Sequence, residues 1–153
     1  MLAAVVAGGG CSFEEEHCSF QYEISGALSG TYESTDATCG TTIFPYQVDL
    51  AVPGSSMSVE IDSTAGGGFV EGSQQVDVEW RSGGTWFDSG DFSDPVACTL
   101  VLDTLATEEW SQGDRARMSG TLSCAAPLVD ALDEDASVEF SNFEFSLFQR
   151  VGY

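Results

Sequence analysis

Apolar and polar residues alternate with a period of two along much of the chain. From residue 20 to residue 32 the even positions carry apolar residues or glycine, and most odd positions carry polar residues. This spacing places successive side chains on opposite faces of a strand, whereas a helix would scatter them around its surface. The same alternation returns in residues 44–52, 57–62 and 76–81. The pattern therefore predicts an all-β protein.

Clusters of glycine, serine and proline separate these segments. They occupy residues 53–56, 66–68 and 82–84, at intervals typical of sandwiches and barrels. We expect an antiparallel two-sheet β-sandwich of about seven to nine strands, with a small β-barrel as the alternative. A bend at Gly26 or Gly30 would break the long first strand, because a missing side chain tolerates a bulge or a corner.

Residues 98–105 and 116–124 form a predicted hairpin whose register follows from the sequence. Centring the turn on Ser111 brings three pairs of residues opposite each other: Cys98 and Cys124, Leu100 and Leu122, and Leu102 and Gly120. Directly opposite residues lie about 4.5–5.5 Å apart, which suits a disulfide between the two cysteines. The same register places Arg117 diagonal to Asp103, where we expect a weak ion pair.

The last apolar segment, residues 138–148, changes phase in its middle. Apolar residues occupy even positions in its first part and odd positions in its second: Val138, Phe140, Phe143, Phe145 and Leu147. A bulge at residues 141–142 would keep both parts facing the core. Before this segment, residues 127–132 begin with proline and place Leu128 and Leu132 at helical spacing, which predicts one or two helical turns.

Residues 1–10, MLAAVVAGGG, form a short apolar and small-residue run that ends at Cys11. Small residues directly before a cysteine, followed by a polar segment, resemble the cleavage site of bacterial lipoproteins, in which the cysteine becomes the lipidated first residue. That family usually has leucine three residues before the cysteine, where this chain has Gly8, and none of the first ten residues is basic. Two interpretations fit: the start codon was assigned too late, or the site is degenerate and Cys11 is an ordinary thiol.

The resemblance to small bacterial envelope lipoproteins sets the expected organisation of the chain. Residues 1–10 are a truncated or atypical export signal, residues 11–17 an acidic tether, and residues 18–150 a single β domain. The resemblance implies an extracytoplasmic location in the bacterial cell envelope. The protein is then either anchored by a lipid on Cys11 or secreted.

The five cysteines support export. Removing Cys11 leaves Cys18, Cys39, Cys98 and Cys124, which can form two disulfides. No C-x-x-C motif is present and one histidine cannot complete a zinc cluster, so disulfides in an oxidising compartment are the better interpretation. If Cys98 pairs with Cys124, Cys18 is left with Cys39, which requires the first strand to fold back. Cys11 is the alternative partner.

Charge narrows the range of partners. The chain has 25 acidic and 4 basic residues, for a formal net charge of -21. Nucleic acids and anionic lipid headgroups are bound through clustered Lys and Arg side chains, which this chain does not offer. The composition therefore excludes nucleic acid as a partner and leaves a lipid anchor as the one expected contact with a membrane.

No catalytic residues can be assigned from the sequence. His17 is the single histidine, no G-x-S-x-G motif is present, and 25 acids offer too many possible carboxylate pairs. Asp88, Asp91 and Asp94 lie at steps of three in a loop with glycine and serine, and could ligate calcium through oxygen. A solvated acidic loop is the alternative interpretation. No other cofactor is expected.

The three tryptophans have different surroundings in the sequence. Trp80 continues the apolar face of its strand and is predicted to be buried. Trp86 and Trp110 lie beside carboxylates, where exposed aromatic rings would suit a glycan or a protein partner. Packing in the core or a loop is the favoured interpretation for both, because buried aromatics are the norm. We therefore expect a non-enzymatic, exported, membrane-anchored acidic module with a binding or structural role. The alternative is an extracellular carboxylate-based hydrolase, with or without calcium.

Overall fold

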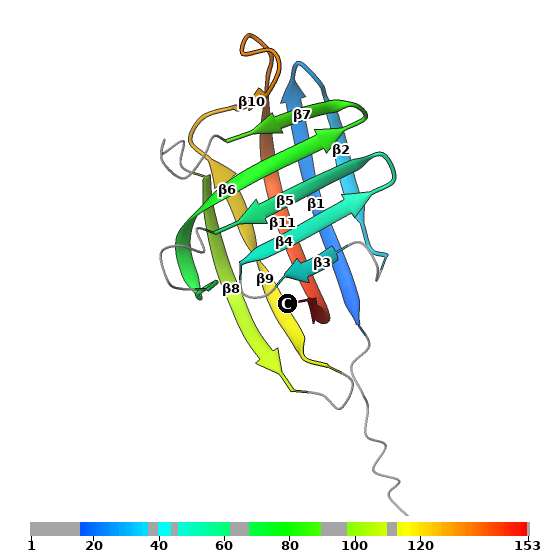
Figure 1. Ribbon diagram of the computed structural model, residues 1–153, viewed down its shortest axis with the longest axis vertical. Helices are drawn as coiled ribbons and strands as arrows, with labels where there is room; N and C mark the ends of the chain where they lie inside the picture. Colours follow the sequence, from blue (N-terminus) through cyan, green and yellow to red (C-terminus); the bar gives the residue numbers. More distant parts are fainter. Residues whose placement is uncertain are drawn as a thin grey trace, which may run out of the picture.

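The structure, a computed structural model, describes residues 16–36, 40–43, 46–61, 68–89, 98–109 and 113–152. These residues form eleven strands and no helix, which confirms the all-β prediction (Figure 1). The strands are β1 (His17–Gly26), β2 (Gly30–Ser34), β3 (Gly40–Ile43), β4 (Gln47–Val52), β5 (Ser55–Glu60), β6 (Gly72–Ser82), β7 (Thr85–Asp88), β8 (Cys98–Glu108), β9 (Arg115–Cys124), β10 (Leu128–Asp130) and β11 (Ser137–Gly152).

The strands lie in two layers (Figure 1). One layer has the order β2-β1-β11-β9-β8. The other layer has the order β3-β4-β5-β6-β7. All pairs within the two layers are antiparallel, so the protein has the sandwich-like fold that the alternation predicted.

Hydrogen bonding also continues from one layer into the other. Strand β6 pairs with β8 through residues 72–76 and with β5 through residues 77–82. Strand β3 joins β11 in a short parallel pair, and β10 joins β7 to β11. The strand count exceeds the expected range of about seven to nine. Strands β3, β7 and β10 have only four, four and three residues, too few for an alternation to be recognised.

The first apolar run forms a hairpin of two strands rather than one long strand. Phe20 of β1 faces Ser34 of β2, and the chain folds back after Gly26. Gly26 has a φ of 111°, and a Cβ atom there would collide with the carbonyl oxygen of Ser137. Only glycine fits this approach, so the chain folds back at one of the two glycines that the sequence indicated.

The core lies between the two layers. Five aromatic side chains from both layers form a continuous cluster within it: Tyr22, Tyr32, Trp80, Phe87 and Phe143. Trp80 is fully buried, as predicted, and its Nε1 donates a hydrogen bond of 3.0 Å to the Tyr22 hydroxyl. Burial raises the pKa of Tyr22 to about 12, so this hydroxyl stays neutral at physiological pH.

The β8–β9 hairpin has the predicted register up to Leu102, and Cys98 and Cys124 form the predicted disulfide. Beyond Leu102 a bulge shifts the register by one residue. The shift makes Glu108, not Asp103, the diagonal neighbour of Arg117. Arg117 pairs with Glu108 at 3.5 Å. The predicted ion pair between Arg117 and Asp103 is therefore wrong.

Strand β11 contains the predicted bulge. Its register with β1 slips opposite residues 21–23, and Asn142 at this point has a φ of 53°. The side-chain amide of Asn142 donates a hydrogen bond of 2.9 Å to Glu23. Apolar residues on both sides of the bulge are buried, as expected: Val138, Phe143, Phe145 and Leu147.

Residues 127–132 do not form the predicted helical turns. Leu128 faces Val138 of β11, and residues 128–130 form the short strand β10. The backbone groups of β7 and β11 offer this segment hydrogen-bond partners, whereas an isolated helical turn is unfavourable in a short peptide. Leu132, the second residue of the helical spacing, is 94% exposed.

Cys18 is disulfide-bonded, and Gly40 lies against its sulfur atom. Cys39 and Cys11, the two partners considered for it, lie outside the described residues. The pairing of Cys18 with Cys39 therefore stays a prediction.

The predicted export signal and the first five residues of the tether also lie outside the described part of the chain. His17, the last residue of the predicted tether, already faces Phe148 in the sheet. Across the described residues, the structure contains no helix with the length and apolar character needed to cross a membrane.

Candidate functional site

Strands β4, β5, β6 and β7 present one face to the core and one face to solvent. The register aligns the polar side chains of the outer face in rows that cross the strands. The first row contains Gln47, Glu60 and Asp77, the second contains Asp49, Ser58, Glu79 and Asp88, and the third contains Ala51, Ser56, Arg81 and Trp86. We call the surface formed by these three rows the acidic face.

Five carboxylates and one arginine occupy the acidic face: Asp49, Glu60, Asp77, Glu79, Asp88 and Arg81. Neighbouring strands are about 4.8 Å apart, so several of these charges are close to one another. Partial burial raises the pKa of Glu60 above its ordinary value, and the charges of three neighbouring carboxylates raise it further. The repulsion therefore converges on Glu60, at the end of β5.

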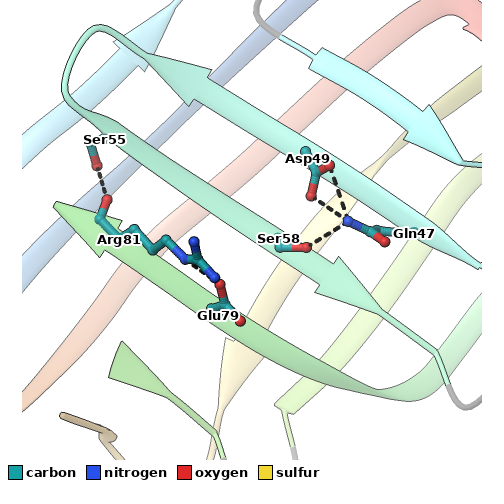
Figure 2. Close-up of polar contacts among 6 residues, drawn as sticks. All are labelled: Gln47, Asp49, Ser55, Ser58, Glu79 and Arg81. Carbon is teal, nitrogen blue, oxygen red and sulfur yellow. Dashed lines mark hydrogen bonds and ion pairs between the residues drawn. The ribbon is translucent and has the colours of Figure 1, made fainter. Parts of the chain in front are cut away.

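Gln47 connects two strands of the acidic face (Figure 2). Its side-chain amide donates hydrogen bonds to both carboxylate oxygens of Asp49, at 2.9 and 3.1 Å. The same nitrogen donates to the hydroxyl of Ser58 on β5, at 3.2 Å. These contacts hold the Asp49 carboxylate in one orientation on the surface.

Arg81 lies between a carboxylate and an aromatic ring. Its Nε donates to a carboxylate oxygen of Glu79, the neighbour two residues before it on β6 (Figure 2). Its guanidinium carbon lies 4.9 Å from the centroid of the Trp86 ring, a distance typical of a cation–π contact. Trp86 is nevertheless 41% exposed. Arg81 thus orients the indole while much of the ring remains accessible.

Asp77 is held at the edge of the acidic face by Ser89, which follows β7. The Ser89 hydroxyl donates to a carboxylate oxygen of Asp77 and accepts a hydrogen bond of 2.9 Å from the backbone N–H of Val78. Because Ser89 is itself buried, it fixes the position of the Asp77 side chain.

The predicted calcium site is described only in part. Asp88 lies on the acidic face opposite Glu79, whereas Asp91 and Asp94 lie outside the described residues. Within the ranges that the structure describes, no group of three or more His, Cys, Asp or Glu side chains is placed to hold a metal ion. The calcium site formed by the three aspartates remains a prediction.

The other singled-out side chains are not brought together. Trp86 is exposed on the acidic face, although packing in the core or a loop was the favoured interpretation from the sequence, and Trp110 lies outside the described residues. His17 lies in β1 of the other layer, where its ring centroid is 6.2 Å from that of Phe148. The histidine therefore belongs to a different surface from Trp86.

The sequence pointed to Trp86 but not to three carboxylates of the same acidic face, Glu60, Asp77 and Glu79. These three residues come from two strands and become neighbours only through the register between β5 and β6. The signal was present in the polar positions of residues 57–62 and 76–81. Pairing these two segments as antiparallel strands would have predicted the cluster.

No protein-family model, curated protein or solved structure matches this chain. The acidic face is therefore interpreted from its own chemistry. The exposed indole offers stacking and apolar contact, and the carboxylates offer negative charge and hydrogen-bond acceptors. This combination suits the binding of a ligand that carries positive charge and some apolar surface.

Proposed function

We propose that the protein is a non-enzymatic binding module of the bacterial cell envelope, and that its acidic face binds a basic segment of a protein partner. The observation that carries this proposal is the position of Trp86, an exposed indole on a sheet face with five carboxylates. Exposed tryptophans are frequent centres of binding energy in protein interfaces. Negative charge around such a residue accelerates association with a positively charged partner.

The charges favour a basic protein segment over a neutral glycan. Burial raises the pKa of Glu60, and repulsion from three neighbouring carboxylates raises it further. A Lys or Arg side chain placed among them would relieve that repulsion in addition to forming its own ion pair. A neutral sugar would gain hydrogen bonds without this relief, so it is the weaker candidate for this face.

The proposed anchor is a lipid on Cys11. Strand β1 begins at His17, so residues 11–16 would form the tether. Six extended residues reach about 20 Å, which would keep the domain close to the membrane surface. Globomycin treatment, which blocks lipoprotein signal cleavage, should cause the uncleaved form to accumulate. Mass spectrometry of the native protein should show a lipidated Cys11, and an unmodified cysteine would contradict the anchor.

A carboxylate-based hydrolase is the second candidate, and one observation favours it. The pKa of Glu60 is raised, as that of a general acid in such enzymes is. Glu60 lies on the outer face of a sheet, however, whereas a groove lined by residues of β1, β2 and β11 lies on the other layer. Release of p-nitrophenol from a panel of nitrophenyl glycosides, abolished in Glu60→Gln, would favour the hydrolase over the binding module.

Photo-crosslinking in cells tests the binding function. A photoreactive amino acid replaces Ser56, in the same row of the acidic face as Trp86, and in a control variant it replaces the exposed Thr121 on the other layer. We expect a crosslinked protein at position 56 only, with a Lys- or Arg-rich segment at the crosslink. Equal products at both positions, or a partner segment without basic residues, would contradict the proposal.

A synthetic peptide of the crosslinked segment then provides an affinity measurement. Trp86→Ala should weaken its binding by about tenfold or more, which corresponds to about 1.4 kcal/mol. Glu79→Gln should weaken it less and should reduce the salt dependence of binding. Glu139→Gln, an exposed change on β11, is the matched control and should leave the affinity unchanged.

A further inference from the structure

A groove of about 550 Å³ lies on the outer face of the other layer, across strands β1, β2 and β11. Its volume falls within the range of about 300–1,000 Å³ that is typical of small-molecule binding sites. It is open to solvent rather than enclosed. Polar side chains line it, among them Ser19, Gln21, Glu33, Thr35, Glu144 and Ser146.

The register explains the shape of the groove. Gln21 of β1 lies between Glu33 of β2 and Glu144 of β11, because both residues face it across their strand pairs. Their backbones are therefore about 10 Å apart, twice the spacing of neighbouring strands. In the next row Ser19 faces Ser146, and these short side chains leave a hollow beside the longer ones.

The floor of the groove is firmly held. Phe20 and Phe145 face each other across β1 and β11. They alternate with the outward-facing side chains of the groove and are buried in the core on the opposite side of the sheet. The backbone beneath the groove is thus part of the central strand pair of its layer. A site on such a rigid sheet loses little conformational entropy when a ligand binds.

The polar groups of the groove are accessible to a ligand. Within the described part of the chain, the side chains of Gln21, Glu33 and Glu144 make no hydrogen bond or ion pair with another residue. None of the described residues that line the groove is basic. The groove therefore combines carboxylate acceptors, an amide that both donates and accepts, and serine and threonine hydroxyls.

We propose that this groove binds a neutral oligosaccharide. Sugar hydroxyl groups donate to carboxylates and both donate to and accept from amides and hydroxyls, so they match each group that lines the groove. The two glutamates, with no basic residue beside them, would repel uronic acids and other anionic sugars. An open groove suits a ligand that continues as a chain beyond the site. The protein would then bind a glycan on one layer and a basic protein segment on the other.

An NMR titration of the ¹⁵N-labelled protein tests this site. The probes are cellohexaose and maltohexaose as neutral chains, a hexamer of galacturonic acid as the anionic control, and a hexamer of glucosamine as the cationic control. We expect at least one neutral hexamer to shift the amide signals of residues 19–21, 33–35 and 144–146, and the anionic hexamer to shift none of them. Absence of shifts with both neutral hexamers would overturn the proposal. Binding of the glucosamine hexamer alone would also overturn it, in favour of a cation site.

Variants of the groove complete the test. Ser146→Tyr fills the hollow without changing its charge and should abolish binding, while Gln21→Ala and Glu144→Gln should each weaken it by about tenfold. If Ser146→Tyr does not fold, the isosteric Glu144→Gln still tests the proposal. Glu139→Gln on the same strand is the control. Binding that survives in all three groove variants would place the sugar elsewhere.

The result of the oligosaccharide titration does not depend on whether the acidic face binds a basic protein segment. Trp86 lies on the other layer, so Trp86→Ala should leave the affinity for the oligosaccharide unchanged. A loss of sugar binding in Trp86→Ala would assign the sugar to the acidic face and overturn the groove as its site.

Discussion

The indole nitrogen of Trp80 donates a hydrogen bond of 3.0 Å to the hydroxyl of Tyr22 inside the core. Trp80 belongs to β6 and Tyr22 belongs to β1, so this contact joins the two layers of the fold. Both side chains are almost completely buried. A polar bond at this depth fixes how the layers face each other, because any other arrangement would leave a buried donor without an acceptor.

Tyr22→Phe removes the acceptor and leaves the Trp80 indole N–H buried without its partner. We expect the free energy of unfolding to fall by about 1–3 kcal/mol. Urea denaturation followed by tryptophan fluorescence measures this change. Tyr46→Phe, at an exposed position, is the control and should have little effect. Equal stability of Tyr22→Phe and the wild type would show that the bond contributes nothing.

Replacement of both Cys98 and Cys124 by alanine should destabilise the domain by about 3 kcal/mol. The disulfide closes a loop with a sequence separation of 26 residues, and its removal increases the conformational entropy of the unfolded chain. The melting temperature of the wild type should fall on addition of a reducing agent. The melting temperature of the double variant should fall less, because only the disulfide at Cys18 remains to be reduced. An unchanged melting temperature in the double variant would contradict the expected contribution.

The raised pKa of Glu60 makes stability depend on pH. The folded protein holds the proton of this carboxyl more tightly than the unfolded chain does, so acidification stabilises the folded state at this position. This contribution is complete below the unfolded pKa and is lost as the pH rises through the raised folded pKa. Glu60→Gln should therefore raise the melting temperature at pH 7 and have a smaller effect at pH 4.

Two measurements check the origin of this effect. The difference in melting temperature between Glu60→Gln and the wild type should decrease with added salt, because salt screens the carboxylates around Glu60. Glu139→Gln, the same change at an exposed position of β11, is the control. A Glu60→Gln variant less stable than the wild type at pH 7 would contradict the assigned repulsion.

Asn142 occupies a left-handed backbone conformation, with a φ of 53°, at the bulge of β11. Asn142→Val should destabilise the domain by about 1–2 kcal/mol, since a branched side chain is strained there. Asn142→Gly should be close to neutral, because glycine accepts this conformation while losing only the hydrogen bond to Glu23. Thermal melting of the two variants compares them directly, and a valine variant as stable as the glycine variant would argue against strain.

The fold was predictable where the alternation was long and where a covalent bond fixed the register. The facing of Cys98 and Cys124 followed from the sequence because both apolar faces and both cysteines agreed on one pairing. The bulge after Leu102 was missed, although the apolar phase changes there, from the even position of Leu102 to the odd position of Leu105. Strand β10 was misassigned because the spacing of Leu128 and Leu132 is helical, whereas the partners that make it a strand come from distant parts of the chain.

The candidate sites were predictable only in their local elements. Trp86 stood out because an aromatic residue next to carboxylates is visible in the sequence itself. The neighbours that give it an acidic surrounding depend on the pairing of β5, β6 and β7. The groove was missed for the same reason, because Gln21 and Glu144 are 123 residues apart in the chain and meet only through the pairing of β1 with β11.

Strand β11 has a consequence for when the domain can fold. It pairs with β1, β9, β10 and β3, so the strand nearest the end of the chain connects partners from its whole length. Sheets dominated by such distant pairings form slowly, because long loops must close before their contacts become favourable. During synthesis, β1 cannot pair with β11 until residues 137–148 have left the ribosome. The layer that contains β1 should therefore stay incomplete until β11 has been made.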